Sequence, residues 1–495
     1  MGAERAPRPL RGRLRIEPLA EGDLDRIHEA SLRVLESAGL RISSRRILDA
    51  LAESGAQVEA ESQRVRFPRR MVEEAIARAP SRYALAARDP TWDVPIGAGE
   101  GYLSLDGCAA EIADLESGAR RPPTTADLVA ATRLADAVEE VAILWPCVAV
   151  TDVPPWAQAV RQTQVQLANS TKHLQAMSTF TARDARAVIE MARVVAGGSR
   201  PLRDRPIVSS FQCSISPLVY EGDAMEAALE FALAGVPCGF VAMALATATA
   251  PTTLAGHLVT VNAELLGGVA VLETLVPGAP TFIGPYQAFM DLGTGGIDLA
   301  WGPEEVLFKL AAAQLARRYA LPMNILAFAT GSKTQDWQAG AQHAISLMGV
   351  AAACEADLIS ATGTLYGSRV FALENVLLDA ELFDLVRRLL DGWGTGEDDL
   401  ALEVIEAVGP GGHFLGQAHT RTHMRELWMP RFFDRRPWEE WETAGRPGPR
   451  DAARDRVREI LAEHEPDPLP EDAERELARI VESHEGETKG AAHGG

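Results

Sequence analysis

The chain has 495 residues, of which 47% are hydrophobic and 24% are charged, a mixture typical of a globular protein. Asp and Glu outnumber Lys and Arg by 69 to 48, so the net charge is −21. This balance argues against non-specific binding to nucleic acid or to an anionic membrane, because basic patches supply that affinity.

The five cysteines are scattered, and no pair forms a CxxC motif. This usage indicates reduced thiols and predicts a cytoplasmic protein. The N-terminal segment MGAERAPRPLRGRLRIEP is basic but lacks the apolar core of a signal peptide. Polar residues or prolines interrupt every apolar stretch before 18 residues, so we expect no transmembrane helix.

Residues 1–100 are predicted to form an N-terminal arm followed by a small α+β cap. Apolar residues recur with a helical period over 22–40. A strand-like segment, VEAESQRVRF, follows, and Pro68 marks the first turn of a second helix. This unit is a candidate oligomerisation element, and we expect a homo-oligomer.

Residues 101–400 alternate between short apolar runs and helical segments. The predicted strands are 102–105, 143–150, 173–177, 207–212, 239–245, 281–283, 323–328 and 358–361. The predicted helices are 125–138, 157–168, 184–196, 223–234, 252–273, 303–319, 337–353 and 374–391. Eight such units favour a (β/α)8 TIM barrel, with a doubly wound open sheet as the alternative. No GxGxxG or GxxxxGK[ST] motif follows any of these strands, which weakens a nucleotide-binding interpretation.

Residues 401–495 leave this pattern. They carry six aromatic residues between Phe414 and Trp441, among basic and acidic residues. Helices are predicted at 450–462 and 470–483. We expect this part to form a helical and aromatic strap, folded over the barrel or against another subunit.

Several segments within this frame carry a family resemblance, and their order and spacing are more specific than any one of them. They are LANSTKH, LVTVNAELLGG, PGAPTFIG, GPEEVLFKLAAAQLARRYALP, SKTQDWQAG, LLDAELF and GHFLGQAHT. Together they resemble the trimethylamine methyltransferase (MttB) family over nearly the whole chain.

The resemblance implies a TIM barrel that moves a methyl group from a methylated amine to the cobalt of a separate corrinoid-binding protein. It implies no cofactor bound directly by this chain. The founding branch of the family places pyrrolysine at the end of a barrel strand, and that position falls on Ala329 here. The chain therefore resembles the non-pyrrolysine branch, whose members demethylate quaternary amines such as glycine betaine.

A quaternary ammonium carries its own activation, because loss of a methyl group leaves a neutral amine. The enzyme then has to hold the cation, aim one methyl group outward and exclude water, which is catalysis by positioning. Ala329 is adequate for that task, so no covalent intermediate on the protein and no essential general acid are expected.

Aromatic faces suit a quaternary ammonium, since each cation–π contact contributes about 0.5–2 kcal/mol. Tyr286, Phe328 and Tyr366 are the preferred candidates, because they end or follow the last three strands, where barrel enzymes keep their sites. Other candidates are Trp145, Phe289, Trp337 and Phe371. Each of these rings could instead serve core or helix packing.

Polar candidates follow from strand ends and from departures from the family pattern. Arg369 could bind the carboxylate of a betaine as a bidentate fork, or it could be a surface ion pair. Glu374 could supply negative charge or cap a helix. Gln212 ends the fourth strand. Gln342 and His343 stand where the family has a Glu-Lys pair, and His343 is a possible substrate contact.

His413, His419 and His423 are weak metal candidates, because the last two have the i, i+4 spacing of zinc ligands. Hydrogen bonding within the strap is the interpretation we prefer, and no metal is predicted. Lys172 and Lys333 are expected to be structural, since an amine substrate has no carbonyl with which a lysine could condense.

Two alternative functions remain open. One is a zinc-dependent barrel methyltransferase or hydrolase that uses the histidines. The other is a quaternary amine-binding protein without turnover. The sequence does not specify which methylated amine is bound.

Overall fold

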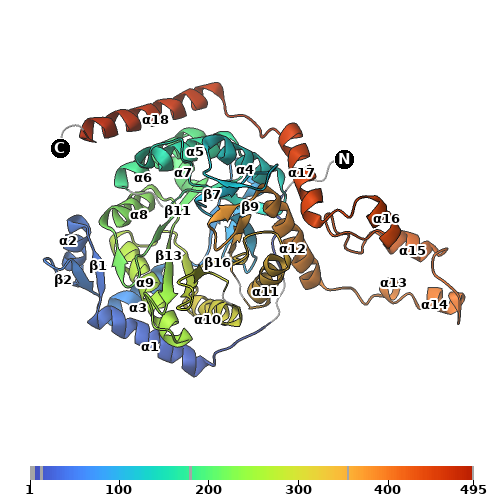
Figure 1. Ribbon diagram of the computed structural model, residues 1–495. Coiled ribbons are helices and arrows are strands. Elements are labelled where there is room, and N and C mark those ends of the chain that lie inside the picture. The colour runs from blue at the N-terminus through green and yellow to red at the C-terminus, as the bar shows by residue number, and fades with distance from the viewer. Residues whose placement is uncertain (1–5, 12–14, 178–180, 301, 354–355, 493–495) are drawn as a thin grey trace.

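The computed structural model describes residues 6–11, 15–177, 181–300, 302–353 and 356–492. Eight of its strands lie in parallel around a ring (Figure 1). They are β6 (Tyr102–Leu105), β9 (Val141–Leu144), β10 (His173–Gln175), β11 (Val208–Cys213), β13 (Cys238–Ala246), β14 (Ile283–Met290), β16 (Asn324–Leu326) and β17 (Leu358–Thr362). The strands pair in the order β14, β13, β11, β10, β9, β6, β17 and β16. A parallel bridge between Ile283 and Met323 joins the two ends, which closes the barrel and confirms the predicted (β/α)8 fold.

Eight long helices lie outside the ring (Figure 1), each within two residues of its predicted bounds. They are α4 (Thr125–Ala137), α5 (Gln158–Ala168), α6 (Ala182–Ala196), α8 (Gly222–Ala234), α9 (Leu254–Leu275), α10 (Pro303–Tyr319), α11 (Trp337–Ala353) and α12 (Leu373–Asp391). Local signals set their ends. Gly197 and Gly235 adopt left-handed backbone angles that terminate α6 and α8.

Helix α9 is long and apolar enough to cross a membrane, with a mean hydropathy of 1.5, whereas the sequence analysis expected no such helix. In the folded chain, 78% of that apolar window is buried. The inner side of α9 packs on β13 and β14, and helices α1 and α3 cover it from outside. Burial on two sides accounts for the composition of α9.

The N-terminal unit lies on the outer wall of the barrel and not over its mouth (Figure 1). It consists of α1 (Glu21–Ser37), β1 (Leu40–Ile42), α2 (Arg45–Glu53), β2 (Gln57–Glu59), β3 (Arg64–Arg66) and α3 (Arg69–Arg78). β1 pairs with β12 (Val219–Tyr220) of the barrel part. A side chain at Gly267 of α9 would place its Cβ 2.4 Å from Leu40, so glycine permits this close approach.

Shorter elements shape the mouth. β7 (Glu111–Ala113), β8 (Arg120–Arg121), β18 (Thr364–Leu365) and β19 (Val370–Phe371) form a small sheet beyond the carboxyl ends of β6 and β17. β15 (Ile297–Asp298) pairs with the end of β14. The remaining short elements are β4 (Tyr83–Leu85), β5 (Val94–Ile96), α7 (Ser199–Asp204) and the 3-10 turns η1 (Pro90–Trp92) and η2 (Pro155–Ala157).

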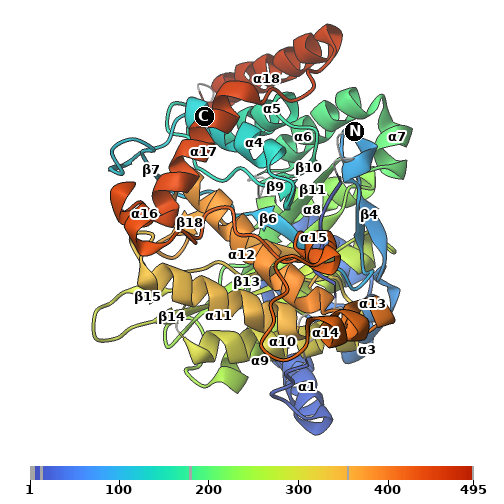
Figure 2. The same ribbon diagram turned by 90° about the vertical axis from the view of Figure 1, so that its right-hand side faces the viewer.

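Residues 392–446, which we call the arm, stand away from the barrel in Figure 1 and pass in front of α12 in Figure 2. The arm holds α13 (Glu397–Leu400), α14 (Leu402–Val408), α15 (Ala418–His423) and α16 (Trp438–Thr443). None of these four helices has a buried residue. Exposed apolar side chains of the arm include Trp393, Leu402, Leu415, Met424, Leu427 and Trp438.

The chain then returns to the barrel as α17 (Pro449–Glu463) and α18 (Glu471–Ala492), the latter longer than predicted. α17 packs on α12 and α4, and α18 packs on α5 and α6. The ion pair between His464 and Asp136 spans 2.8 Å and fixes the end of α17. The C-terminal helices thus brace the outside of the barrel. The division of the chain at residues 100 and 400 stays a prediction.

His173 allows a test of the buried polar core. It is fully buried, with Nδ1 2.7 Å from the Ala86 carbonyl oxygen and Nε2 2.9 Å from the Ser209 hydroxyl. Burial lowers its pKa from 6.5 to about 4. Below pH 6.5 His173 becomes protonated in the unfolded chain, whereas in the folded chain it stays neutral until about pH 4. We expect stability to fall over this window by up to about 1.4 kcal/mol per pH unit.

Thermal unfolding measured between pH 4 and 8 checks this expectation. His173→Gln should flatten the pH dependence within this window. The matched substitution His413→Gln, at an exposed position, should leave it unchanged. Identical pH profiles for the three proteins would contradict the assignment.

Candidate active site

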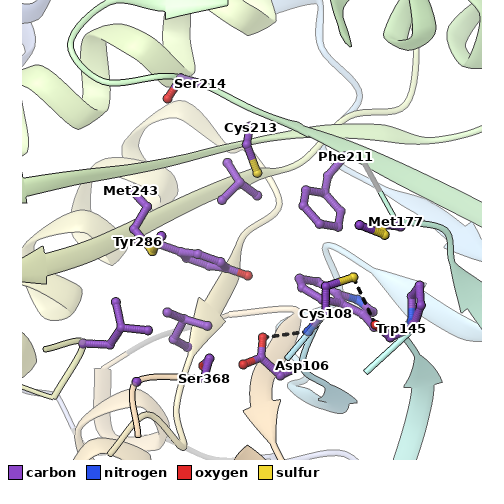
Figure 3. Close-up of a pocket in the computed structure, with 16 residues that line it drawn as sticks. Asp106, Cys108, Trp145, Met177, Phe211, Cys213, Ser214, Met243, Tyr286 and Ser368 are labelled. Carbon is purple, nitrogen blue, oxygen red and sulfur yellow. Dashed lines mark hydrogen bonds between the residues drawn. The ribbon is translucent and has the colours of Figure 1, made fainter. Parts of the chain in front are cut away.

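A cavity of about 400 Å³ opens at the carboxyl ends of the barrel strands (Figure 3), the end at which barrel enzymes carry their sites. Its walls come from segments at or just beyond the strand ends. The lining residues are Asp106, Gly107, Cys108, Trp145, Pro146, Met177, Phe211, Cys213, Ser214, Val241, Met243, Tyr286, Leu299, Leu326, Gly367 and Ser368.

Three aromatic rings form the walls. Trp145, directly after β9, stacks on Phe211 of β11 with ring centres 4.8 Å apart and an angle of 24°. Its indole nitrogen donates a hydrogen bond to Gln175. Tyr286 of β14 reaches in from the opposite side, as Figure 3 shows. All three rings are largely buried, with exposed fractions between 3% and 8%, so they offer desolvated faces.

Gly107 is required by the position of the indole. A Cβ at this residue would lie 2.6 Å from Cε3 of Trp145. No side chain fits between the backbone and the ring, so the turn after β6 can approach Trp145 only with glycine.

One carboxylate, that of Asp106, lies in the cavity wall and is 5% exposed. Oδ1 accepts a hydrogen bond from the Gly107 amide at 2.8 Å, and the Thr364 hydroxyl lies 3.4 Å from Oδ2. The Ser368 hydroxyl also donates to it. Burial raises the pKa of Asp106 above its usual range, and these three donors oppose the shift.

No described residue that lines the cavity carries a positive charge. The lining therefore combines aromatic faces with one negative group, which is the arrangement that binds an organic cation. It offers no cluster of histidine or carboxylate ligands for a metal among its described residues.

The two lining cysteines are poor nucleophiles. The surrounding cavity wall desolvates the Cys213 thiol and raises its pKa to about 12, even though the residue is exposed at the mouth. Burial also raises the pKa of Cys108. Because the thiolate is the reactive form, both remain neutral thiols at physiological pH.

Among the predicted substrate contacts, Tyr286 lines the cavity, as does the further candidate Trp145. Tyr366 is partly buried just beside the lining residue Gly367. Its ring faces Lys333 Nζ at 4.9 Å and the exposed Arg369 guanidinium at 5.4 Å. These three side chains form a stack next to the cavity and are not part of its lining.

Phe328, Ala329 and His343 lie behind the cavity wall. Phe328 and Ala329 are fully buried, and the Phe328 ring meets His343 edge-on at 5.7 Å. His343 Nδ1 lies 2.8 Å from the carboxylate of Asp379. Gln342 holds the loop that follows: its Oε1 accepts from the Thr330 hydroxyl at 2.6 Å.

Gln212 and Glu374 also lie outside the lining. Side chains alternate along a strand, so Gln212 faces away from the cavity while its neighbours Phe211 and Cys213 line it. Glu374 is fully buried, and its carboxylate pairs with Arg450 of α17 at 3.1 Å. Its partner thus lies in the C-terminal bracing helix. Of the other aromatic candidates, Phe289 and Phe371 are buried outside the lining, and Trp337 is 89% exposed.

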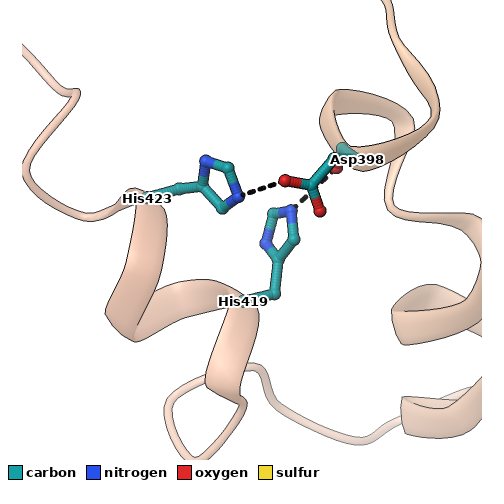
Figure 4. A group of neighbouring side chains, drawn as sticks. All are labelled: Asp398, His419 and His423. Carbon is teal, nitrogen blue, oxygen red and sulfur yellow. Dashed lines mark hydrogen bonds and ion pairs between the residues drawn. The ribbon is translucent and has the colours of Figure 1, made fainter.

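The histidine cluster lies on the arm (Figure 4). His419, His423 and Asp398 bring one ligand-type atom each within 4.8 Å of one another, whereas His413 is not part of the group. His419 Nε2 lies 3.0 Å from the Asp398 carbonyl, and His423 pairs with Asp398 at 3.2 Å and with Glu426 at 2.9 Å. Glu426 and then Asp398 raise the pKa of His423. Asp398 is a carboxylate partner that the sequence analysis did not identify.

Lys172 is buried near the opposite end of the barrel. Its ammonium donates to the carbonyl oxygens of Ala135, Val138 and Val141 at 2.6–2.8 Å and lies 4.0 Å from the Trp92 ring. This is a structural role.

Sequence reasoning missed Asp106 and Phe211. A signal for Asp106 existed, because it directly follows the first barrel strand in the segment LSLDG. For Phe211, the predicted end of the fourth strand pointed to the neighbouring residue Gln212 as the site residue. The side chain that faces inward depends on the strand register, which a strand's approximate ends do not define.

The fold thus defines a TIM-barrel protein, and its cavity at the carboxyl ends of the strands combines aromatic faces with one carboxylate among the described lining residues. A family profile described as "Trimethylamine methyltransferase (MTTB)" matches residues 2–488. The chain belongs to this family.

Curated relatives match over nearly their full length. Trimethylamine methyltransferase MttB of Desulfitobacterium hafniense (strain DSM 10664 / DCB-2) is 34% identical over 94% of either chain. Glycine betaine methyltransferase of Desulfitobacterium hafniense (strain Y51) is 30% identical over 94% of this chain and 96% of that one. A solved structure, the Methanosarcina barkeri monomethylamine methyltransferase (MtmB), aligns with a TM-score of 0.49 and 12% identity over 90% of this chain and 95% of that one.

The raised pKa of Cys213 is testable by alkylation. We expect iodoacetamide at pH 8 to label Cys213 in the folded protein at least about tenfold more slowly than in the denatured protein, because the folded thiol is neutral. Peptide mass spectrometry over a time course measures both rates. Equal rates would contradict the assignment.

Proposed function

We propose that this protein transfers a methyl group from a quaternary amine to the Co(I) of a corrinoid carried by a separate protein. The observation that carries the proposal is the buried arrangement of Trp145, Phe211 and Tyr286 around a cavity in which Asp106 is the one charged residue of the described lining. The trimethylamine and glycine betaine methyltransferases among the relatives support methyl transfer from an amine.

The proposed reaction requires little acid–base catalysis by the residues of this chain. The methyl carbon receives an electron pair from the acceptor cobalt, while the pair of the old carbon–nitrogen bond stays on nitrogen, which leaves as a neutral amine. The aromatic walls and Asp106 hold the cation, and the apolar lining excludes water. A fixed approach of the two reactants can supply several kcal/mol of the barrier reduction.

The residues of this chain fit that scheme without an unusual side chain at position 329. The resemblance assigns the pyrrolysine position to Ala329, which is fully buried and is not a lining residue. The neutral thiols of the cavity and the paired His343 support the absence of a covalent intermediate on protein.

The acceptor must reach the cavity from outside, and the rim supports docking of a corrinoid-binding protein. Cys213 and Met243 are exposed within the opening. Exposed apolar residues beyond the strand ends are Ile215 and Leu292, in loops, and Trp337, at the start of α11. Such a transient interface is expected to be modest in area and partly polar.

The further predictions are part of the same proposal. They are a cytoplasmic location, no nucleic acid or membrane partner, and a homo-oligomeric state. The scattered cysteines support the cytoplasmic location. The net charge of −21 supports the lack of a nucleic acid or membrane partner, and the exposed apolar side chains of the arm support self-association.

The proposal is tested by incubating the purified protein with Co(I) cobalamin and a panel of quaternary amines. We expect methylcobalamin to form with at least one of these amines. Its formation is monitored by the change in absorbance. Trp145→Ala and Phe211→Ala should each lower kcat/KM by about 2- to 30-fold, because each removes a contact of about 0.5–2 kcal/mol.

Trp438→Ala, on the arm, is the matched control and should retain full activity. Binding of an amine without methylcobalamin formation under any condition would favour the non-catalytic alternative.

Metal analysis tests the zinc alternative. We expect methyl transfer to survive EDTA, because the described lining residues include no group of three His, Cys, Asp or Glu side chains close enough to hold a metal. His419→Ala with His423→Ala should leave activity unchanged but speed tryptic cleavage within 392–446, since it removes the contacts to Asp398. Stoichiometric zinc together with loss of activity on chelation would instead support a metalloenzyme.

A further inference from the structure

The charge and hydrogen-bond inventory of the cavity bears on which methylated amine it accepts. A betaine and a simple ammonium share the cationic head that aromatic rings bind. They differ in the carboxylate of the betaine, which needs a positive partner or free hydrogen-bond donors once it leaves water.

Both serine hydroxyls among the described lining residues are already committed to other acceptors. Ser368 donates to Asp106. Ser214 donates to Glu264, a fully buried carboxylate behind the wall. A second carboxylate in the cavity would therefore find neither of these protons free.

Tyr286 is committed in the same way. Its hydroxyl lies 3.2 Å from the Ser360 hydroxyl, and the single proton of Ser360 is directed at Asn324 Oδ1, 2.8 Å away. The Tyr286 hydroxyl is thus the donor of this pair. Its ring face stays available to a cation, but its proton is not available to an anion.

The electrostatic balance points the same way. Asp106 needs one positive charge to offset its burial, and a simple ammonium supplies it. A betaine would bring a second negative charge into the same 400 Å³, where like charges repel strongly because the dielectric constant is low. Arg369 is exposed and lies against Tyr366, outside the lining.

We infer that the cavity selects a methylated ammonium that carries no carboxylate, and that Asp106 is the residue that determines this selectivity. The inference rests on the proposed function for the reaction and on the cavity alone for the binding. Tetramethylammonium and choline have the required chemistry. Protonated trimethylamine also has it, and its N–H could donate to Asp106.

Binding is measured first, by calorimetry with the full-length protein and no corrinoid, so that the result is independent of turnover. The probes are tetramethylammonium, choline, trimethylamine and glycine betaine. We expect the first two to bind at least about tenfold more tightly than glycine betaine, a difference of about 1.4 kcal/mol. Trimethylamine that binds as tightly as tetramethylammonium would identify a proton-bearing cation as an equal source.

Two variants separate the rival explanations. Asp106→Asn should weaken the binding of tetramethylammonium and of choline at least tenfold. It should also reduce the ratio of their affinities to the affinity for glycine betaine. Asp106→Glu should restore part of the affinity, because it keeps the charge. Arg369→Gln should change every affinity less than twofold, as should the matched surface change Asp204→Asn at the exposed end of α7.

Tighter binding of glycine betaine by the unaltered protein, with a selective loss in Arg369→Gln, would overturn the inference. Equal losses for all four probes in Asp106→Asn would also overturn it, and thermal unfolding would show whether that variant is folded. If tetramethylammonium or choline binds as expected but gives no methylcobalamin, the proposed function fails while the inference stands. Turnover of glycine betaine in preference to choline leaves the function intact and removes the inference.

Discussion

Closure of the strand ring is the constraint on which the site depends. In a closed ring of parallel strands, every strand delivers its carboxyl end to the same rim. Asp106 and Trp145 directly follow β6 and β9, and Phe211 and Tyr286 lie on β11 and β14, so the closed ring brings these four residues together. The join is slender, since one parallel bridge, between Ile283 and Met323, connects β14 to β16. The outer helices, and α17 and α18 that pack on them, therefore also stabilise the position of the rim.

The buried carboxylate of Asp106 is an electrostatic feature of the cavity that favours binding of a cation. A buried carboxylate is costly, and the donors to Asp106 offset only part of that cost, because burial still raises its pKa. Under the proposed function, a bound cation would offset the remainder, so part of its affinity would come from relieving the cost of burying Asp106. The rings of Trp145 and Phe211 add attraction that is indifferent to hydrogen bonding. This combination favours a permanent cation over a neutral amine, which would leave Asp106 uncompensated.

The sequence predicted the barrel well because its signals are local. Helical periodicity, caps and terminal glycines define the bounds of the eight barrel helices to within two residues. Site residues depend on information that is not local. A shift of one residue along β11 decides that Phe211 and Cys213 line the cavity and Gln212 does not. The role of Glu374 depends on Arg450, in a helix beyond the arm. Tyr286 was expected to follow a short strand at 281–283. It lies instead within the longer β14, and it does line the cavity. Asp106 was overlooked despite its place directly after a strand.

The position of Ala329 relative to the cavity has a mechanistic consequence. Its side chain lies behind the wall, next to Phe328, whose ring packs against His343, and the loop beyond it is fixed by Gln342. His343 Nδ1 lies 2.8 Å from the carboxylate of Asp379 and Gln342 Oε1 accepts from Thr330, whereas the buried His343 Nε2 has no hydrogen-bond partner among the described residues. Under the proposed function, the residues that hold the cation lie on or directly after β6, β9, β11 and β14, and the proposed scheme asks for no reactive group from β16. A substrate that already carries positive charge makes such a division possible, because its leaving nitrogen needs no help beyond being held with one methyl group toward the mouth.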